Sequence, residues 1–540
     1  MANKIMLRVL FTICVITCFA SCGITHTTLH GRRSISPNEY GLSMAKTDIE
    51  RFYVLERTHK AAVANSTNVS YYGIESIDIE IPSNASSIPI GENTDFCGVT
   101  INVRNNTKDI RLFSAVAPRK SVQLSGSQID HGNFSGVQEL SRGRKLLIIE
   151  DEKPWGDKRN GYDYAHIRKD ILLVMKGKSV NEPVMPYDNS YSNPKCLYIE
   201  LNGEPFVFEN LTVNRTPDCK FKTFILYVDG YDDVRLENVS VNTPDNDLLG
   251  DYVIRIHNCT NVSIKNVTIQ GTYSSEEHSG YGISLNNVWD FKANHLYGRG
   301  KWGVFGTNNV NKATLVDCDI NRFDIHCYGK DCFFKRVNFV DRDNQLSSVY
   351  GSVVFDECTF SNFTPLMSRS SYNAFVGYEL FFNNCIFNVT PKKKSLLSMG
   401  VLNNKINSRP ELKEKCWPNI HINNLTVNMT DGARDFFLLY NRIEGESLPV
   451  IHYIKSIEIN GLTIFAEEGK PLKSIVLGTK DVETVNEIEI ILNGINVYDK
   501  AADGRRRSIS AKRVPMSISL PVEEKSIRFN NLNGVEFKSY

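Results

Sequence analysis

Residues 208–213 read Phe208-Glu209-Asn210-Leu211-Thr212-Val213. In this stretch a turn-forming residue, Asn210, stands between short runs of strand-forming residues. The same pattern returns at residues 236–241 and again at residues 264–269, each time 28 residues later. The third position is asparagine in all three copies, and asparagine tolerates a left-handed turn better than most residues. The stretch therefore predicts a repeating strand–turn–strand unit.

The pattern continues to the end of the chain with spacings of 19 to 40 residues. We place its third position at residues 210, 238, 266, 293, 317, 336, 357, 384, 424, 461, 494 and 531. No copy contains a long amphipathic helix, and a helix-free period in the twenties is typical of one coil of a parallel β-helix. Leucine-rich repeats are excluded because their leucine spacing is absent, and a propeller would need four antiparallel strands per repeat. We predict an all-β, right-handed parallel β-helix solenoid of about twelve coils over residues 91–540.

The N-terminal part of the chain lacks this repeat. Residues 48–64 are predicted to form one amphipathic helix whose apolar positions are Ile49, Phe52, Val54, Leu55 and Ala61. Because the end coil of a solenoid exposes its core, we expect this helix, within a segment covering residues 23–90, to cap the first coil. The charged stretch 140–200 is interpreted either as an elaborated early coil or as an inserted lobe beside a groove.

Residues 1–22 are predicted to be a signal peptide. Lys4 and Arg8 flank an apolar run that is too short to span a membrane as a mature helix. The run ends in Phe19-Ala20-Ser21-Cys22-Gly23, which resembles a bacterial lipobox. We therefore expect Cys22 to be lipidated and the protein to be exported as an outer-membrane lipoprotein, facing the periplasm or the cell surface. An ordinary secretory signal with a chance cysteine is the alternative.

Charge and cysteine content narrow the possible classes. The chain has 62 lysines and arginines against 61 aspartates and glutamates, so its overall charge gives no reason to expect nucleic-acid binding. Cys318, Cys358 and Cys385 recur in one local repeat context and are predicted to be small buried core residues, not a disulfide framework. No cluster of histidine and cysteine has zinc-ligand spacing. We predict no metal site and no cofactor, with a bound calcium ion as an open alternative.

The strongest candidate for chemistry is the alternating stretch 322–328. On a strand, Phe323, Ile325 and Cys327 would point into the coil. The opposite set would share the outer face and be exposed along a groove: Arg322, Asp324, His326 and Tyr328. A cation, a carboxylate, an imidazole and a phenol within one strand are proton-transfer groups, so we predict this set to be catalytic.

A second pair, Arg255 and His257, is predicted to lie on the same ridge, three rungs or about 14 Å away. By repeat counting, Asp324 falls in one row with His257, and Arg322 in one row with Arg255. Between these rungs lie two loops. We expect the loops and the pair to bind substrate through Arg255, His257, Glu276, Glu277, His278, Lys301 and Trp302, the tryptophan by stacking on a sugar ring.

The coils, the export signal and the polar outer ridge resemble the pectate-lyase-like right-handed β-helix superfamily over roughly residues 91–540. That resemblance implies a polysaccharide lyase, a glycoside hydrolase or a phage tailspike depolymerase. The catalytic signatures of polygalacturonases and pectate lyases are absent from the sequence, so no catalytic residue is carried over from them.

Three functions remain open from the sequence. An exported glycan-cleaving enzyme would act as a lyase through Arg322 with His326 or Tyr328, or as a hydrolase through Asp324 with Glu276 or Glu277. A glycan-binding or adhesion protein would use the same groove without turnover. A purely structural solenoid is disfavoured because its ridge should not cluster ionisable residues. The predicted partners are a polysaccharide and, through the lipid, a membrane.

Overall fold

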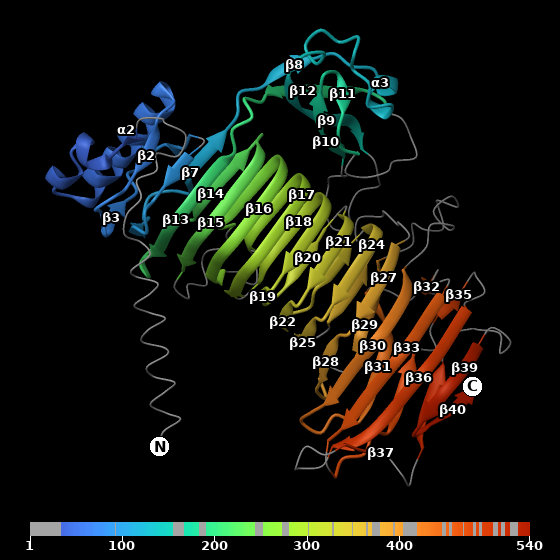
Figure 1. The fold of residues 1–540 in the computed structure, drawn as a ribbon. Coiled ribbons are helices and arrows are strands. Elements are labelled where there is room, and N and C mark those ends of the chain that lie inside the picture. The colour runs from blue at the N-terminus through green and yellow to red at the C-terminus, as the bar shows by residue number, and fades with distance from the viewer. Residues whose placement is uncertain are drawn as a thin grey trace, which may run out of the picture.

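The computed structural model has a right-handed parallel β-helix as its main body, capped by a helix at one end and carrying a small lobe (Figure 1). It describes residues 34–91, 93–154, 167–182, 191–243, 252–272, 280–300, 302–326, 329–347, 349–362, 365–369, 378–392, 395–402, 418–444, 450–452, 456–467, 469–478, 482–484, 489–500, 506–508, 513–518 and 527–539. Among these residues, no helix is long and apolar enough to cross a membrane.

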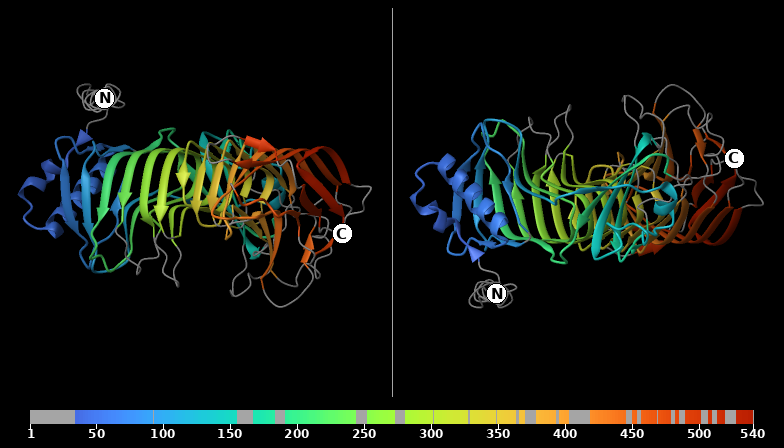
Figure 2. Two further views of the ribbon diagram at one scale, coloured as in Figure 1. Left: turned by 90° about the horizontal axis from the view of Figure 1, so that it is seen from below. Right: turned by 90° about the horizontal axis from the view of Figure 1, so that it is seen from above.

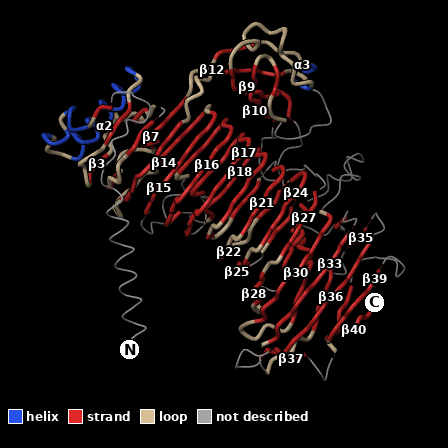
Figure 3. Tube along the Cα trace, viewed as in Figure 1, coloured by secondary structure: helices blue, strands red, loops and turns tan. Residues whose placement is uncertain are grey.

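Three stacks of parallel strands make up the β-helix, and each coil contributes to all three (Figure 3). The first stack runs from β4 (Ile88–Pro89) through β7 (Ile110–Val116), β14 (Thr223–Asp229), the starts of β16 (Ile254–Thr272), β17 (Tyr281–Gly300) and β18 (Gly303–Val316), then β20 (Phe323–Ile325), β23 (Gln345–Ser347), β26 (Leu366–Arg369), β29 (Ser395–Leu402), β31 (Asp435–Glu444), β34 (Ser474–Leu477), β38 (Val514–Ile518) and β40 (Val535–Ser539). The predicted all-β parallel β-helix is confirmed.

The second and third stacks share several long, bent strands. The second includes β2 (Asn68–Ser70), β5 (Asn93–Asp95), β13 (Phe206–Arg215), β15 (Asp232–Asn242), β21 (Gly329–Lys335), β24 (Val349–Asp356), β27 (Tyr378–Asn383), β30 (Asn419–Met429), β33 (Ser456–Ala466), β36 (Glu489–Lys500) and β39 (Ile527–Asn533). The third adds β3 (Ser76–Glu80), β6 (Thr100–Arg104), β19 (Asp319–Ile320), β22 (Asn338–Asp341), β25 (Thr359–Asn362) and β28 (Ile386–Val389). Outside the stacks, β1 (Ser34–Ile35) pairs with β2, β37 (Arg506–Ser508) pairs with β36, and β32 (Val450–His452) pairs with β35 (Val482–Thr484).

The repeat position is the corner between the second and third stacks, and its backbone is left-handed. Asn210, Asn238 and Asn266 have φ values of 59°, 54° and 53°, and eleven of the twelve predicted third positions have positive φ. The exception is Ala293, because the left-handed residue of that coil is His295, with φ of 55°. Lys265 pairs with Asn294, so our alignment of this coil is wrong by two residues.

The coil interior is apolar and ordered rung by rung. Phe334, Phe355 and Phe382 stack on successive coils with ring centroids 4.9 and 5.3 Å apart. The three cysteines of the repeat are buried thiols in this core, as predicted: Cys318, Cys358 and Cys385.

The helix α2 (Asp48–Asn65) covers the open end of the first coil (Figure 1). Its N-terminus has a capping box between Thr47 and Glu50, and Phe52 and Leu55 are fully buried against the core. Of the predicted apolar positions, Ile49 is exposed because it lies on the solvent side of the helix. Two short 3-10 helices precede α2, at Pro37–Tyr40 and Leu42–Met44.

Between β7 and β13 the chain leaves the β-helix and forms a lobe (Figure 2). The lobe is an antiparallel sheet with α3 (Gly126–Asp130), and its strands in spatial order are β11 (Lys178–Ser179), β10 (Ile167–Met175), β9 (Arg144–Pro154), β12 (Pro194–Glu200) and β8 (Lys120–Val122). One face of this sheet encloses a small core of its own, while Ile148, Ile171 and Ile199 on the other face pack with Trp289 and Tyr350 of the coils.

Candidate functional site

The outward face of the first stack, from β7 to β23, is the candidate site, and we call it the ridge. Strand register defines two outward rows along it. One row is Tyr227, Arg255, Ser284, Gly306, Asp324 and Gln345. The other is Asp229, His257, Asn286 and Asn308, and His326 follows Ile325, which pairs with Thr307.

This register confirms that the Arg255/His257 pair lies three rungs from Asp324 and His326, about 14 Å at the spacing of parallel strands. It corrects our assignment of rows, because Asp324 is in the row of Arg255 and not in that of His257. The error arose from counting residues across coils whose corners differ in length.

On the predicted catalytic strand, the described inward side chains are buried as expected, but two of the outward side chains are buried as well. Phe323 and Ile325 are buried in the core as predicted. Arg322 and Asp324, predicted to be exposed, are 3% and 0% exposed. The alternation itself is right, since Phe323 and Ile325 join the apolar core while Asp324 contacts Tyr281 and the partly exposed His326. They are buried because side chains from neighbouring coils cover the outer face above them.

The covering side chains make Asp324 the centre of a hydrogen-bonded cluster. Its Oδ2 accepts from Tyr281 Oη at 2.7 Å and from Arg322 Nη2 at 2.5 Å, and lies 3.1 Å from His326 Nε2. His326 retains partial exposure, with 17% of its side chain accessible. Asp324 is therefore held as a paired anion that orients the imidazole, and it is not placed to touch a substrate.

Tyr281 reaches Asp324 because two glycines make room for its ring. A Cβ on Gly306 would lie 2.6 Å from Tyr281 Cγ, and one on Gly303 would lie 3.3 Å from its Cδ1. The ring therefore crosses β18 in direct contact with the backbone. Burial, followed by the charge of Asp324, raises the pKa of Tyr281 far above its usual value, so the phenol stays protonated.

Trp302, predicted to stack on a sugar ring, is partly buried and packs on two arginines. The guanidinium of Arg322 lies 4.3 Å from its ring centroid, and that of Arg342 lies 5.5 Å away. Cation–π contacts of this kind hold the indole over the buried ion pair. Trp302 is thus part of the cover that excludes water from Arg322 and Asp324.

A second cluster on the ridge surrounds Asp229. Asp229 Oδ2 accepts from Tyr227 Oη at 2.8 Å, and its Oδ1 accepts from Asn258 Nδ2 at 2.8 Å and pairs with Arg119. The ring of His257 meets that of Tyr227 edge to face at 5.2 Å. Burial, with the nearby charge of Arg255, lowers the pKa of His257 to about 4, so its imidazole is neutral at pH 7.

Two arginines flank this second cluster. The guanidinium of Arg111, on β7, lies 3.8 Å from the ring centroid of Tyr227, and that of Arg255 lies 4.7 Å from that of Tyr252. Tyr252 stacks near Phe224 at 6.4 Å and Tyr281 at 6.1 Å, which forms an aromatic edge along the ridge. Arg111 is exposed, whereas Arg255 is half-buried.

The lobe borders the ridge on the side of the His257 row. Asn309 Nδ2 donates to the carbonyl of Lys169 at 2.6 Å, and Asn287 Nδ2 donates to that of Asp170 at 3.3 Å. Asn287 and Asn309 are corner residues, one position after Asn286 and Asn308 of the ridge. Strand β10 is thus held directly beside the ridge.

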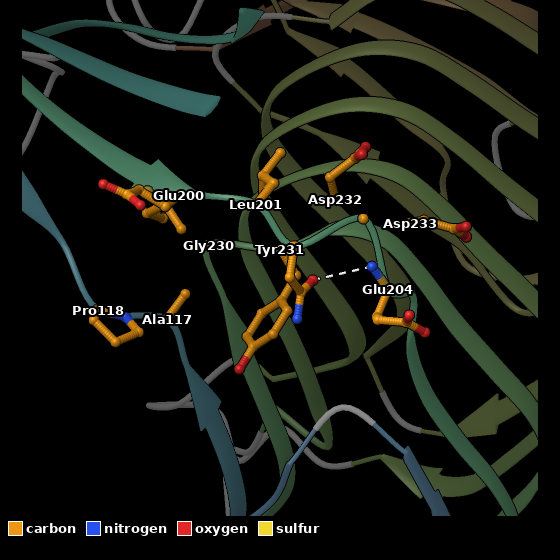
Figure 4. Close-up of a pocket in the computed structure, with 12 residues that line it drawn as sticks. Ala117, Pro118, Glu200, Leu201, Glu204, Gly230, Tyr231, Asp232 and Asp233 are labelled. Atoms are coloured by element: carbon orange, nitrogen blue, oxygen red, sulfur yellow. Dashed lines mark hydrogen bonds between the residues drawn. The ribbon is translucent and has the colours of Figure 1, made fainter. Parts of the chain in front are cut away.

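A small pocket of about 130 Å³ lies at the base of the lobe, where the chain leaves and rejoins the β-helix (Figure 4). Ala117, Glu200, Glu204, Tyr231 and Asp232 line it. Asn202 Oδ1 accepts from the backbone N–H of Glu204 at 3.0 Å, which shapes the connecting turn. The pocket shares no residue with either ridge cluster.

Several predicted residues lie outside the described ranges: Cys22, Glu276, Glu277, His278, Lys301, Cys327 and Tyr328. Within the described ranges, no group of three or more metal-ligating side chains is arranged around a common point.

The sequence did not single out Arg111, Tyr227, Asp229 or Tyr281 as functional. Arg111 and Tyr227 come from coils on either side of the inserted lobe, more than a hundred residues apart, so no local pattern joins them. Asp229 accepts a hydrogen bond from Tyr227, two residues earlier, and the presence of a tyrosine at that spacing was the available signal in the sequence.

Comparison with known proteins identifies the fold. No family model matches the sequence, and no curated protein sequence matches it. The tailspike protein gp49 of Pseudomonas phage LKA1 has a similar structure, with a TM-score of 0.56 and 14% identity over 92% of this chain and 84% of the tailspike. The tailspike gp61 of Pseudomonas phage phi297 gives 0.49 and 12% over 80% and 81%. The Gp54 tailspike of Acinetobacter baumannii bacteriophage AP22, solved with a capsular saccharide, gives 0.45 and 12% over 86% and 79%. The chain is thus a right-handed parallel β-helix protein with the fold of a phage tailspike.

Proposed function

We propose that this protein binds a polysaccharide along the ridge and cleaves its glycosidic bonds. The observation that carries the proposal is the partly exposed His326, oriented by the buried Asp324 and lying on one face with a second Asp–Tyr–His cluster three to four rungs away. A linear face of this kind suits an extended chain that contacts several rungs at once. The alternative is a glycan-binding or adhesion protein that uses the same face without turnover.

The geometry favours His326 over Asp324 as the group that moves a proton. Asp324 is fully buried and its Oδ2 is occupied by donors, so it does not serve as a hydrolytic acid or nucleophile. The imidazole lies at the surface and its orientation is set by the carboxylate. This supports lyase chemistry over the hydrolase mechanism in which Asp324 was one of two carboxylates.

In such a step, His326 takes the proton from the sugar carbon next to a carboxylate group. The C–O bond to the leaving sugar breaks, a carbon–carbon double bond forms, and the imidazolium returns its proton to the leaving oxygen. The reaction consumes no water and needs no further reactant.

The test is a panel of purified polysaccharides incubated with the wild-type protein and with His326→Gln. We expect one glycan to yield a product absorbing in the ultraviolet, and the variant to lose about a hundredfold or more of this turnover. His131→Gln, at an exposed lobe histidine, is the matched control and should keep full activity.

Other results of the panel have definite meanings. Reducing ends without absorbance would replace the lyase with a hydrolase. Binding without any cleavage would favour the adhesion alternative, and full activity of His326→Gln would place the catalytic centre elsewhere. Arg322→Ala and Asp324→Ala are unsuitable probes, because removing one partner of a buried ion pair costs about 3–5 kcal/mol of stability.

A further inference from the structure

The ridge carries two cationic side chains for which the described residues supply no counter-charge. Other buried or half-buried arginines of the coils have a carboxylate partner, as Arg299 has Asp319 and Arg322 has Asp324. For Arg111 and Arg255, no ion pair exists within the described part of the chain. Their guanidinium groups rest on the faces of Tyr227 and Tyr252 instead.

The one carboxylate nearby is already engaged. Asp229 accepts from Tyr227 and Asn258 and is paired with Arg119. The cations that act on His257 electrostatically are Arg255, Arg111 and Lys169, and of these Lys169 is paired with Glu150 at 2.7 Å. Among the described residues, none is a hydrogen-bond partner of the buried Nε2 atom of His257 or of the buried Nε atom of Arg255. The cluster is therefore positively charged and has unsatisfied polar atoms, a combination that favours an anionic ligand.

Register brings the two arginines to the same short segment of the ridge. Arg111 lies on β7 opposite Phe224, and Arg255 lies on β16 opposite Tyr227, so β14 separates them. The aromatic edge formed by Phe224, Tyr252 and Tyr281 runs beside both. Planar guanidinium groups recognise carboxylates through paired hydrogen bonds, and aromatic faces pack against the apolar side of sugar rings.

We infer that Arg111 and Arg255 form an anion subsite that binds the carboxylate of an acidic sugar, with His257 and Tyr252 contacting the same residue of the glycan. This inference rests on the proposed function, which it deepens by naming the residues that bind an acidic sugar away from the cleaved bond. Arg255 lies three rungs from His326 and Arg111 lies five, so the subsite would hold a sugar a few residues along the chain from the bond that is cleaved. A sulfate ester shares the same charge, and the experiment distinguishes the two.

The test compares binding of three matched oligosaccharides by calorimetry: one built from uronic acid residues, its carboxyl-reduced neutral form, and a sulfated neutral form. We expect the uronic acid form to bind tightest, and Arg111→Gln and Arg255→Gln each to weaken its binding by tenfold to a hundredfold, the usual effect of losing a charged hydrogen bond, about 1.5–3 kcal/mol. Neither variant should change binding of the reduced form. Arg235→Gln, at a neighbouring exposed arginine already paired with Asp233, is the matched control.

Equal binding of the uronic acid and reduced forms would overturn the inference, as would equal weakening by Arg235→Gln. Preference for the sulfated form would replace the carboxylate with a sulfate. Arg111 is exposed, so its variant tests the subsite even if Arg255→Gln folds poorly. Binding and turnover separate the two proposals: cleavage of a uronic acid glycan whose binding is unchanged in Arg111→Gln and Arg255→Gln would exclude the subsite alone. Tight, arginine-dependent binding without cleavage sinks the catalytic proposal alone.

Discussion

At the scale of single residues, the corner between the second and third stacks depends on one left-handed position per coil. The Cβ of an L-residue crowds the following carbonyl in this conformation, and asparagine and glycine accept it at least cost. Side-chain amides at these corners also form a ladder: Asn266 Nδ2 donates to Asn238 Oδ1 at 3.0 Å, and Asn238 Nδ2 donates to Asn210 Oδ1 at 2.9 Å. The asparagine content of the repeats is thus a consequence of backbone geometry.

Asn238→Ala tests this relation, since it keeps φ at an unfavourable value and removes two ladder hydrogen bonds. We expect the free energy of unfolding in urea to fall by about 2 kcal/mol. Asn238→Gly keeps the backbone unstrained and should lose only about half as much. Equal losses in the two variants would show that the ladder, and not the left-handed backbone, dominates.

Buried histidines make the protein sensitive to acid. His59 of α2 is fully buried beside Tyr71 and Phe96, with Nε2 2.8 Å from Tyr71 Oη, and burial lowers its pKa from 6.5 to about 3. The unfolded chain binds a proton more readily than the folded one across this range. The contribution of His59 to the stability of the folded protein is therefore complete above about pH 6.5 and is lost as the pH falls toward 3.

Between pH 7 and pH 5, protonation of His59 in the unfolded chain should lower the free energy of unfolding by about 2 kcal/mol. Urea unfolding at both pH values should show it, and His59→Gln should remove that part of the pH dependence while lowering stability at pH 7. His257, whose pKa is lowered to about 4, changes stability in the same direction and should remain visible in the variant. An unchanged pH dependence in His59→Gln would contradict the assignment.

At the scale of elements, the start of β18 determines the shape of the candidate site. Its two glycines, Gly303 and Gly306, let the ring of Tyr281 pass from β17 over β18 to Asp324 on β20. A strand chosen for stability alone would have side chains at these positions, since glycine weakens a strand interior. The cover over the ion pair thus depends on the absence of side chains from one strand.

Gly306→Ala should displace Tyr281, because the new Cβ would lie 2.6 Å from its Cγ. We expect an overpacking cost of about 1–3 kcal/mol in thermal unfolding and a loss of turnover of about tenfold, as His326 loses its fixed partner geometry. Gly136→Ala, where the added carbon meets open space, is the control and should change neither quantity. Full activity of Gly306→Ala would show that Tyr281 does not matter to the site.

At the scale of the whole molecule, the ridge is bordered by an element from elsewhere in the sequence. The lobe is inserted between β7 and β13, yet its strand β10 lies beside the corners of β17 and β18 through Asn287 and Asn309 (Figure 1).

We expect the whole protein to be anchored by a lipid on Cys22. Detergent extraction of membranes from the expressing bacterium should recover the mature chain in the detergent phase, and Cys22→Ser should release it or leave the signal uncleaved. Multiple acyl chains are needed for firm anchoring, so the wild-type chain should resist a salt wash. Mass spectrometry showing a soluble mature chain that begins at Ser21 or Cys22 without lipid would exclude this.

The sequence by itself determined the solenoid. Each coil is a local unit of strand, left-handed corner and strand, so a pattern such as that of residues 208–213 carries the geometry of its own turn. Inward and outward positions also follow locally, because alternate residues of a strand face opposite sides, and Phe323 and Ile325 were placed correctly for that reason. The helix from Asp48 was readable from its periodicity.

Only the tertiary structure decided what the outward residues do. Burial of Arg322 and Asp324 comes from Tyr281 and Trp302, which belong to other coils, and no rule of strand alternation contains that information. Arg111 joins Tyr227 across the inserted lobe, because parallel pairing brings together residues separated by any length of intervening chain. Local geometry is encoded residue by residue, whereas exposure, charge balance and the pairing of arginines with carboxylates depend on which coils stack and in which register.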